Sequence, residues 1–191
     1  NSINLKTLVD LFEADDLPRV TGILTAELGR LAAAGADFAL LSANTPHIVF
    51  DDLRRQSPIP LVSIVEATCD AAKALKLSKL GLFGTRFTMQ SRFYPEVFSR
   101  AGIALAVPEK DEQSIIHEKY MNELVKGIFR PETREQLLGI VDCLKQREGI
   151  QGLILGGTEL PLILRDDAGR GIPFLDTTRI HVEAAVKVML S

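Results

Sequence analysis

The chain contains an internal repeat, and no other feature of the sequence restricts its fold as strongly. Residues 35–45 (GADFALLSANT) align with residues 149–159 (GIQGLILGGTE) at an offset of 114, and residues 59–63 (IPLVS) align with residues 172–176 (IPFLD) at an offset of 113. Each block has the apolar composition of a short buried strand, and each pair of blocks is followed by a helical pattern. We therefore predict a duplicated α/β unit that forms two similar lobes related by a pseudo-twofold axis.

Short apolar segments alternate with helical patterns along the whole chain, which is typical of an α/β protein with parallel sheets. In such sheets ligands bind beyond the carboxyl ends of the strands. The pseudo-twofold axis would place the equivalent loops at residues 43–45 and 157–159 on opposite sides of one cleft. We assign residues 1–62 and 173–191 to the first lobe and residues 63–172 to the second. The expected strands are residues 36–41, 61–64, 79–83, 104–107, 152–155 and 173–176, and the expected helices are residues 17–34, 66–77, 94–101, 112–129, 131–148 and 178–190.

Composition excludes several classes of protein. The 191 residues carry 22 basic and 25 acidic side chains, so the formal net charge of −3 gives no argument for a nucleic-acid or membrane partner. No segment approaches the length of a transmembrane helix, and the first residues lack the apolar core of a signal peptide. Cys69 and Cys143 are too few for a disulfide scaffold or a structural zinc site, and the three histidines form no metal-binding pair. We expect a soluble, cytoplasmic protein without a metal ion.

Four short motifs lie at residues 42–47 (SANTPH), 82–89 (LFGTRFTM), 155–160 (LGGTEL) and 174–177 (FLDT). Together they resemble the aspartate/glutamate racemase superfamily, nearest to its aspartate racemase branch. The resemblance implies two α/β lobes with an active site between them, and proton transfer at Cα of a small amino or carboxylic acid without pyridoxal phosphate or metal. It also implies a homodimer. The strand equivalent to residues 79–83 would precede Asn1, so we expect the first strand of the first lobe to lie outside this sequence.

The sequence departs from this family at the two positions that carry out its chemistry. By resemblance, an acid/base residue, usually cysteine, directly precedes each of the two dipeptides Asn-Thr and Thr-Glu. This chain has Ala43 and Gly157 there, and neither side chain can transfer a proton. Cys69 and Cys143 fall in predicted helices away from both loops. Three hypotheses follow: a racemase with a different acid/base pair or very low activity, an inactive member that still binds ligand, and another reaction such as decarboxylation or isomerisation in the same cleft.

Polar residues that follow the predicted strands are candidates for binding a substrate carboxylate or amine, although turn and cap chemistry would also explain them. Glu159 could instead act as a general base if burial raised its pKa. Thr88 could be a helix cap, and Lys126 a solvated charge at a helix end. His47 and His181 could reach the cleft or serve a structural role. The predicted substrate-binding residues are Asn44, Thr45, Thr85, Thr88, Thr158, Glu159 and Lys126.

Overall fold

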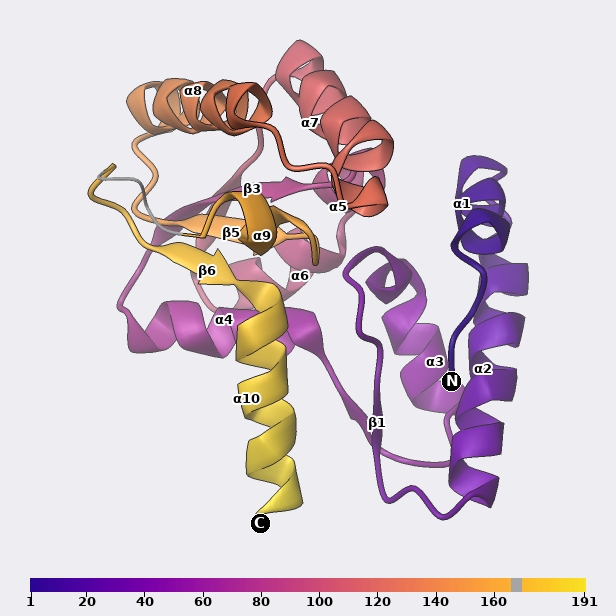
Figure 1. Cartoon of the computed structure of the whole chain (residues 1–191). Helices are drawn as coiled ribbons and strands as arrows, with labels where there is room; N and C mark the ends of the chain where they lie inside the picture. Colours follow the sequence, from indigo (N-terminus) through magenta and orange to yellow (C-terminus); the bar gives the residue numbers. More distant parts are fainter. Residues whose placement is uncertain (166–169) are drawn as a thin grey trace.

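The protein is an α/β structure with two parallel sheets, as the alternating pattern predicts (Figure 1). The computed structural model describes residues 1–165 and 170–191. In the smaller sheet, β1 (Ala39–Leu40) pairs with β2 (Leu61–Val62). The larger sheet has the strand order β4-β3-β5-β6. Its strands are β3 (Lys79–Gly84), β4 (Ala104–Ala106), β5 (Leu153–Gly156) and β6 (Phe174–Asp176).

The repeat in the sequence is reproduced in the register of the strands. Ala39 lies opposite Leu61 in the smaller sheet, and Leu153 lies opposite Phe174 in the larger one. These partners are related by the same offsets of 114 and 113 that align the sequence. Since β6 pairs with β5 as β2 pairs with β1, the end of the chain joins the larger sheet, whereas the sequence interpretation grouped residues 173–191 with the first lobe.

The larger sheet is covered by helices on both faces. Along β3 the side chains alternate, so Phe83 points into a core cluster with Leu137 of α8 (Pro131–Glu148), while Leu82 points into one with Tyr94 of α6 (Phe93–Arg100). α7 (Lys110–Asn122) lies with α8 on the first face, and α4 (Ile64–Ala74) lies with α6 on the other (Figure 1). This three-layer arrangement gives the second lobe its own apolar core.

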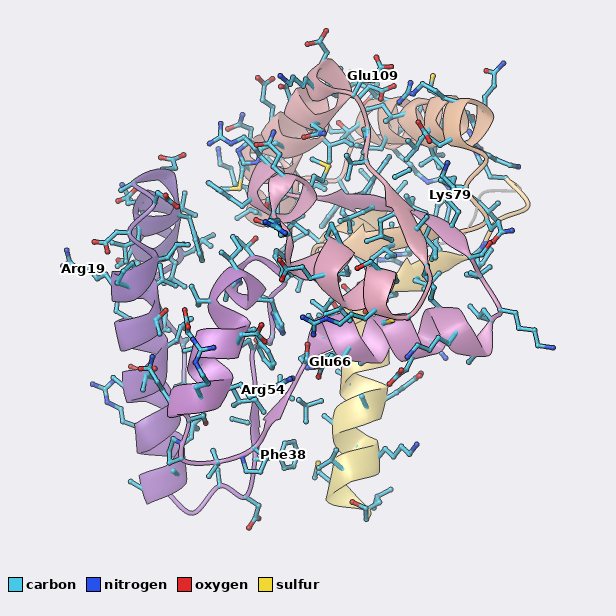
Figure 2. All side chains as sticks on the ribbon, turned by 180° about the vertical axis from the view of Figure 1, so that it is seen from behind. Arg19, Phe38, Arg54, Glu66, Lys79 and Glu109 are labelled. Atoms are coloured by element: carbon cyan, nitrogen blue, oxygen red, sulfur yellow. The ribbon has the colours of Figure 1, made fainter. Side chains whose placement is uncertain are left out.

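The first lobe has a separate core beside the smaller sheet. α1 (Leu5–Glu13), α2 (Leu17–Ala33) and α3 (Phe50–Gln56) contribute to one cluster of buried side chains with β1. α3 reaches the second lobe through an ion pair of 2.6 Å between Arg54 and Glu66 of α4, two residues labelled in Figure 2. Among the described residues, no helix is both long and apolar enough to cross a membrane.

Helix boundaries follow local sequence signals. α8 spans the predicted residues, with proline at its first position and Gly149 at its end in the left-handed region, at φ +63°. The helix predicted at residues 112–129 stops earlier: α7 ends at Asn122, and a short 3-10 turn, η2 (Leu124–Lys126), follows. The buried carboxylate of Glu123 holds this break, because it accepts a hydrogen bond of 2.5 Å from Thr133 of α8.

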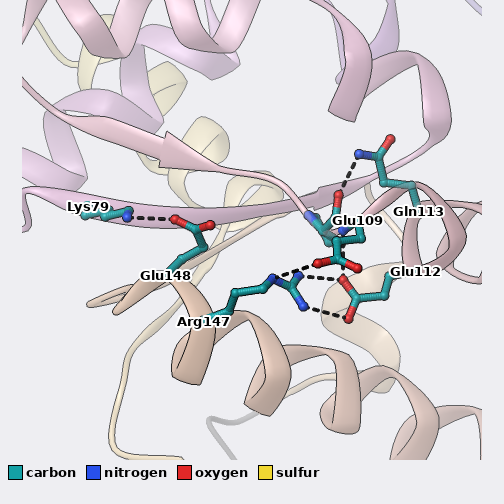
Figure 3. Close-up of polar contacts among 7 residues, drawn as sticks. Lys79, Glu109, Glu112, Gln113, Arg147 and Glu148 are labelled. Atoms are coloured by element: carbon teal, nitrogen blue, oxygen red, sulfur yellow. Dashed lines mark hydrogen bonds and ion pairs between the residues drawn. The ribbon is translucent and has the colours of Figure 1, made fainter.

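Ion pairs at the far end of the larger sheet join α7 to α8 (Figure 3). Arg147 of α8 lies 2.8 Å from Glu112 and 3.4 Å from Glu109, the residue that precedes α7. Lys79 at the start of β3 pairs with Glu148 at 2.9 Å.

The last helix of the structure, α10 (Thr177–Met189), packs against α4. The sequence patterns do not predict α1, α3, the 3-10 turn η1 (Thr45–Val49), α5 (Arg86–Gln90) or α9 (Leu160–Ile163).

Candidate functional site

A cavity of about 150 Å³ lies between the two lobes, where the loops after β1 and β5 meet. Positions 43 and 157, which the family resemblance assigns to proton transfer, both line it. Of the predicted binding residues, Asn44, Thr45, Thr85, Thr158 and Glu159 line it as well. In the part of the chain that the structure describes, Thr88 and Lys126 do not contribute to its wall, and Lys126 is exposed. The binding roles of all these residues stay predictions.

Two glycines allow the strands β3 and β5 to end close together at this cavity. Gly84 lies opposite Gly156 in the sheet. A Cβ added at Gly84 would lie 2.7 Å from the carbonyl oxygen of Gly156, and one added at Gly156 would lie 2.7 Å from that of Phe83. Backbone atoms at such a distance cannot turn aside, so both positions require glycine. The close approach brings the Thr85 loop next to the loop that begins at Gly157.

Three threonine hydroxyls connect the lobes at the cavity, two of them in its wall. Thr45 Oγ1 lies 3.1 Å from Thr85 Oγ1 and 3.3 Å from Thr88 Oγ1, and the latter two are 3.3 Å apart. Thr85 also caps α5, because its hydroxyl accepts a hydrogen bond from the Thr88 amide. The cap is therefore Thr85, and Thr88 is the fully buried partner behind it. A hydroxyl both donates and accepts, so this cluster can redirect a donor toward a ligand carboxylate.

The side chain of Asn44 is engaged in the protein interior. Its amide donates to Thr177 Oγ1 at 3.2 Å, and its Oδ1 accepts a hydrogen bond of 2.7 Å from the Tyr94 hydroxyl. Thr177 Oγ1 in turn donates a hydrogen bond of 2.8 Å to the carbonyl of Leu155. Asn44 is only 3% exposed. It therefore fixes the loop after β1 to the second lobe, and it can meet a ligand mainly through its backbone.

His47 has a structural place beneath the same loop. Its Nε2 accepts a hydrogen bond from the Ile64 amide at 3.3 Å, so the ring proton must be on Nδ1, which donates to the Ala43 carbonyl at 3.0 Å. Burial, with a smaller contribution from nearby His181, lowers the pKa of His47 to about 3. His181 itself lies 2.9 Å from the Val62 carbonyl. The sequence left open whether these two histidines reach the cleft or serve a structural role, and the hydrogen bonds of both rings fit the structural role.

Tyr120 of α7 fills the space that a side chain at position 157 would need. A Cβ added at Gly157 would lie 2.6 Å from Cε2 of Tyr120 and 2.9 Å from its hydroxyl oxygen. That hydroxyl donates a short hydrogen bond to Glu159 Oε2, and Thr158 Oγ1 donates to the same oxygen at 2.6 Å. Burial and the charge of Glu159 both raise the pKa of the Tyr120 phenol, so it stays protonated. The sequence does not identify Tyr120 as a site residue, because nothing in a helical pattern marks which residue turns toward a cleft.

The two sides of the cavity therefore differ chemically. On the first-lobe side, Ala43 presents a methyl group, whereas Glu159 and Tyr120 form a titratable pair on the other. Cys69 is a buried residue of α4, where burial raises the pKa of its thiol, and Cys143 is exposed on α8. Both thiols lie outside the cavity wall, as the sequence predicts. Within residues 1–165 and 170–191, no group of three His, Cys, Asp or Glu side chains could hold a metal ion.

Comparisons with known proteins agree with this architecture. The model of the Asp/Glu/Hydantoin racemase family matches residues 2–185. The chain belongs to this family. It is 30% identical to an uncharacterised protein encoded in the pnlA 3′ region of Pectobacterium carotovorum, over 72% of this chain and 91% of that protein. It is 24% identical to the broad-specificity amino-acid racemase RacX of Bacillus subtilis, over 85% and 69% of the two chains.

A solved structure extends the similarity to the whole fold. The crystal structure of an aspartate racemase homologue from Pyrococcus horikoshii superposes with a TM-score of 0.84 at 30% identity, over all of this chain and 82% of that one. The family and these relatives indicate an amino-acid racemase-type function for the chain. The resemblance seen in the four sequence motifs is thus confirmed at the level of the family.

Proposed function

We propose that this racemase-family protein binds a small amino acid or related carboxylic acid in the cavity between its lobes, without racemising it by a two-base mechanism. The observation that carries the proposal is the position of Tyr120, whose ring occupies the space beside Gly157. Position 157 therefore lacks an acid/base side chain, and the Tyr120 ring occupies the space that such a side chain would need. The neighbouring Thr45, Thr85 and Thr158 hydroxyls remain at the cavity wall to hold a ligand.

Racemisation needs one group to remove the Cα proton from one face and another to return a proton to the opposite face. Glu159 or Tyr120 could serve one face. The opposite face meets Ala43, which can neither accept nor donate a proton. Inversion of configuration therefore lacks a partner on the first-lobe side.

One-sided proton exchange is the second candidate, and the arrangement of Glu159 favours it. Its Oε2 accepts hydrogen bonds from Tyr120 and Thr158, while Oε1 has no hydrogen-bond partner among the described residues. A carboxylate with one oxygen held and the other available is suited to act as a base. Such a site would exchange Cα hydrogen, or support decarboxylation or isomerisation, without inverting the substrate.

Proton exchange in deuterated water separates these functions. We would incubate the protein with L- and D-amino acids, follow Cα deuteration by proton NMR and inversion by chiral chromatography, and measure binding by calorimetry. The proposal predicts saturable binding without inversion. Deuterium uptake with retained configuration would support the second candidate, with Glu159→Gln abolishing it. Inversion at enzymatic rates would overturn the proposal and restore racemisation of aspartate, glutamate or a related acid as the function.

We also propose that the protein forms a homodimer, lies in the cytoplasm and works without pyridoxal phosphate. The homodimer is supported by an apolar strip on α10, where Val182, Val186 and Met189 are 57%, 45% and 70% exposed. Side chains at this spacing share one face of a helix. Light scattering of the purified chain would test it, and a monomer at micromolar concentration would contradict it.

A further inference from the structure

We infer that the cavity selects amino acids with a small aliphatic side chain over dicarboxylic ones, with Glu159 pairing to the ligand ammonium. The inference rests on the proposed function, because it names the class of ligand for the same cavity. It arises from the apolar part of the cavity wall, most of which lies outside the four sequence motifs.

That wall is apolar. α1 contributes Leu8, Val9 and Phe12 to it, and α7 contributes Met121. Phe87 of α5 completes the surface. An alkyl group that enters this part of the cavity leaves water and contacts only carbon and sulfur atoms, which favours its binding.

The wall is fixed across the two lobes. The rings of Phe12 and Phe87 are 5.8 Å apart between centroids. The guanidinium of Arg86 lies 3.9 Å from Glu13 and over the Phe87 ring. These contacts hold α1 of the first lobe against α5 of the second, so the apolar surface is built from both.

The cavity offers nothing to neutralise a second carboxylate. No Lys, Arg or His contributes to its lining within the described residues. The nearby cation of Arg86 is turned to Glu13, and that of Lys6 to Asp10 at 2.6 Å. An aspartate or glutamate side chain would therefore bury its charge beside apolar groups without a partner, which is strongly unfavourable.

The charge that does line the cavity is negative. Glu159 repels a ligand carboxylate, but its free Oε1 can accept a hydrogen bond from an ammonium group. The threonine hydroxyls would then bind the ligand carboxylate. The cavity, at about 150 Å³, has room for a short alkyl side chain.

Calorimetric titration of the full chain with 2-aminobutyrate, alanine and valine, compared with aspartate at constant ionic strength, tests the inference. We expect at least one aliphatic amino acid to bind more than about tenfold tighter than aspartate, because the aspartate side chain would be buried as an unpaired charge. Aspartate binding as tightly as the aliphatic set would overturn the inference and leave the proposed function intact. If none of the four binds, the proposed function and this inference both fail.

Two variants locate the selectivity. Met121→Lys places a cation in the apolar wall with little change of shape, and it should improve aspartate binding relative to 2-aminobutyrate at least about tenfold. Met121→Leu, the matched control, keeps the wall apolar, so it should still prefer 2-aminobutyrate over aspartate. Glu159→Gln should weaken 2-aminobutyrate more than 2-hydroxybutyrate, which lacks the ammonium. Circular dichroism confirms that each variant folds, and an unchanged ratio in folded Met121→Lys would contradict the assignment of this wall.

Discussion

The hydroxyl of Tyr94 donates a hydrogen bond of 2.7 Å to Oδ1 of Asn44, and this bond ties the loop beside Ala43 to the core of the other lobe. Tyr94 is completely buried, and Asn44 nearly so. Burial raises the pKa of the Tyr94 phenol, so it remains a donor at all moderate pH values. The geometry of the cavity on the first-lobe side therefore depends on a residue of α6 that does not line it.

Tyr94→Phe should destabilise the protein by about 1–3 kcal/mol, because Oδ1 of Asn44 would stay buried without that donor. Urea denaturation followed by circular dichroism measures the loss. The double variant Tyr94→Phe/Asn44→Ala should lose less than the sum of the two single variants, since the two residues share one bond. Additive losses would show that the bond contributes little.

Gly157→Cys should destabilise the chain by about 1–3 kcal/mol, because the new side chain overlaps the ring of Tyr120. In a Tyr120→Ala background the same substitution should cost much less, and the thiol should react faster with a disulfide reagent. Ala43→Cys supplies the matched thiol on the other wall. The triple variant is expected to gain Cα exchange, and racemisation if the pocket still fits the substrate. No exchange despite two accessible thiols would mean that the shape of the cavity has diverged.

Gly84→Ala should be more destabilising than Gly157→Ala. At Gly84 the added methyl meets a backbone oxygen of the neighbouring strand at 2.7 Å, whereas at Gly157 it meets a side chain that can rotate. Overpacking of this kind costs about 1–3 kcal/mol, and the backbone contact should reach the upper end. Thermal denaturation of both variants checks the order. Equal losses would indicate that the strands separate easily.

Acid should destabilise the native state through His47. Its pKa of about 3 in the folded chain lies below the ordinary value of 6.5, so below pH 6.5 the unfolded chain binds the proton more readily. Stability is therefore full above pH 6.5 and falls toward pH 3, by at most about 1.4 kcal/mol per unit for this group. His181, whose pKa burial also lowers, adds in the same direction. We would measure the free energy of unfolding of His47→Gln and of the parent protein between pH 4 and 7. It should change less with pH in His47→Gln, and an equal pH dependence in the two proteins would contradict the assignment.

The internal repeat carried most of what could be predicted. It aligns β1 with β5 and β2 with β6, and the structure pairs β1 with β2 and β5 with β6 in the corresponding register. The assignment of residues 173–191 to the first lobe does not predict the pairing of β6 with β5. Helix α8 was predictable from its proline start and glycine end. Leu5, Leu8, Val9 and Phe12 have the spacing of a helical face, so the sequence does contain a signal for α1, which is absent from the expected helices.

Other parts of the site were beyond sequence reasoning. Asn44 was predicted to bind ligand from its place after a strand, yet its side chain turns inward to Tyr94, a partner 50 residues away. Tyr120 reaches Glu159 from a helix whose buried and cleft-facing residues look alike in sequence. Such choices depend on tertiary packing, which neither spacing nor composition encodes.

The register of the duplicated strands gives the cavity two equivalent walls, but the walls have changed in different ways. Beside Ala43 the lost side chain leaves a methyl group, while beside Gly157 the ring of Tyr120 takes the space. An enzyme that interconverts mirror-image ligands must hold both with similar strength. A cavity that is open on one wall and filled on the other contacts the two enantiomers of a ligand differently, so this protein should bind one enantiomer more tightly than the other.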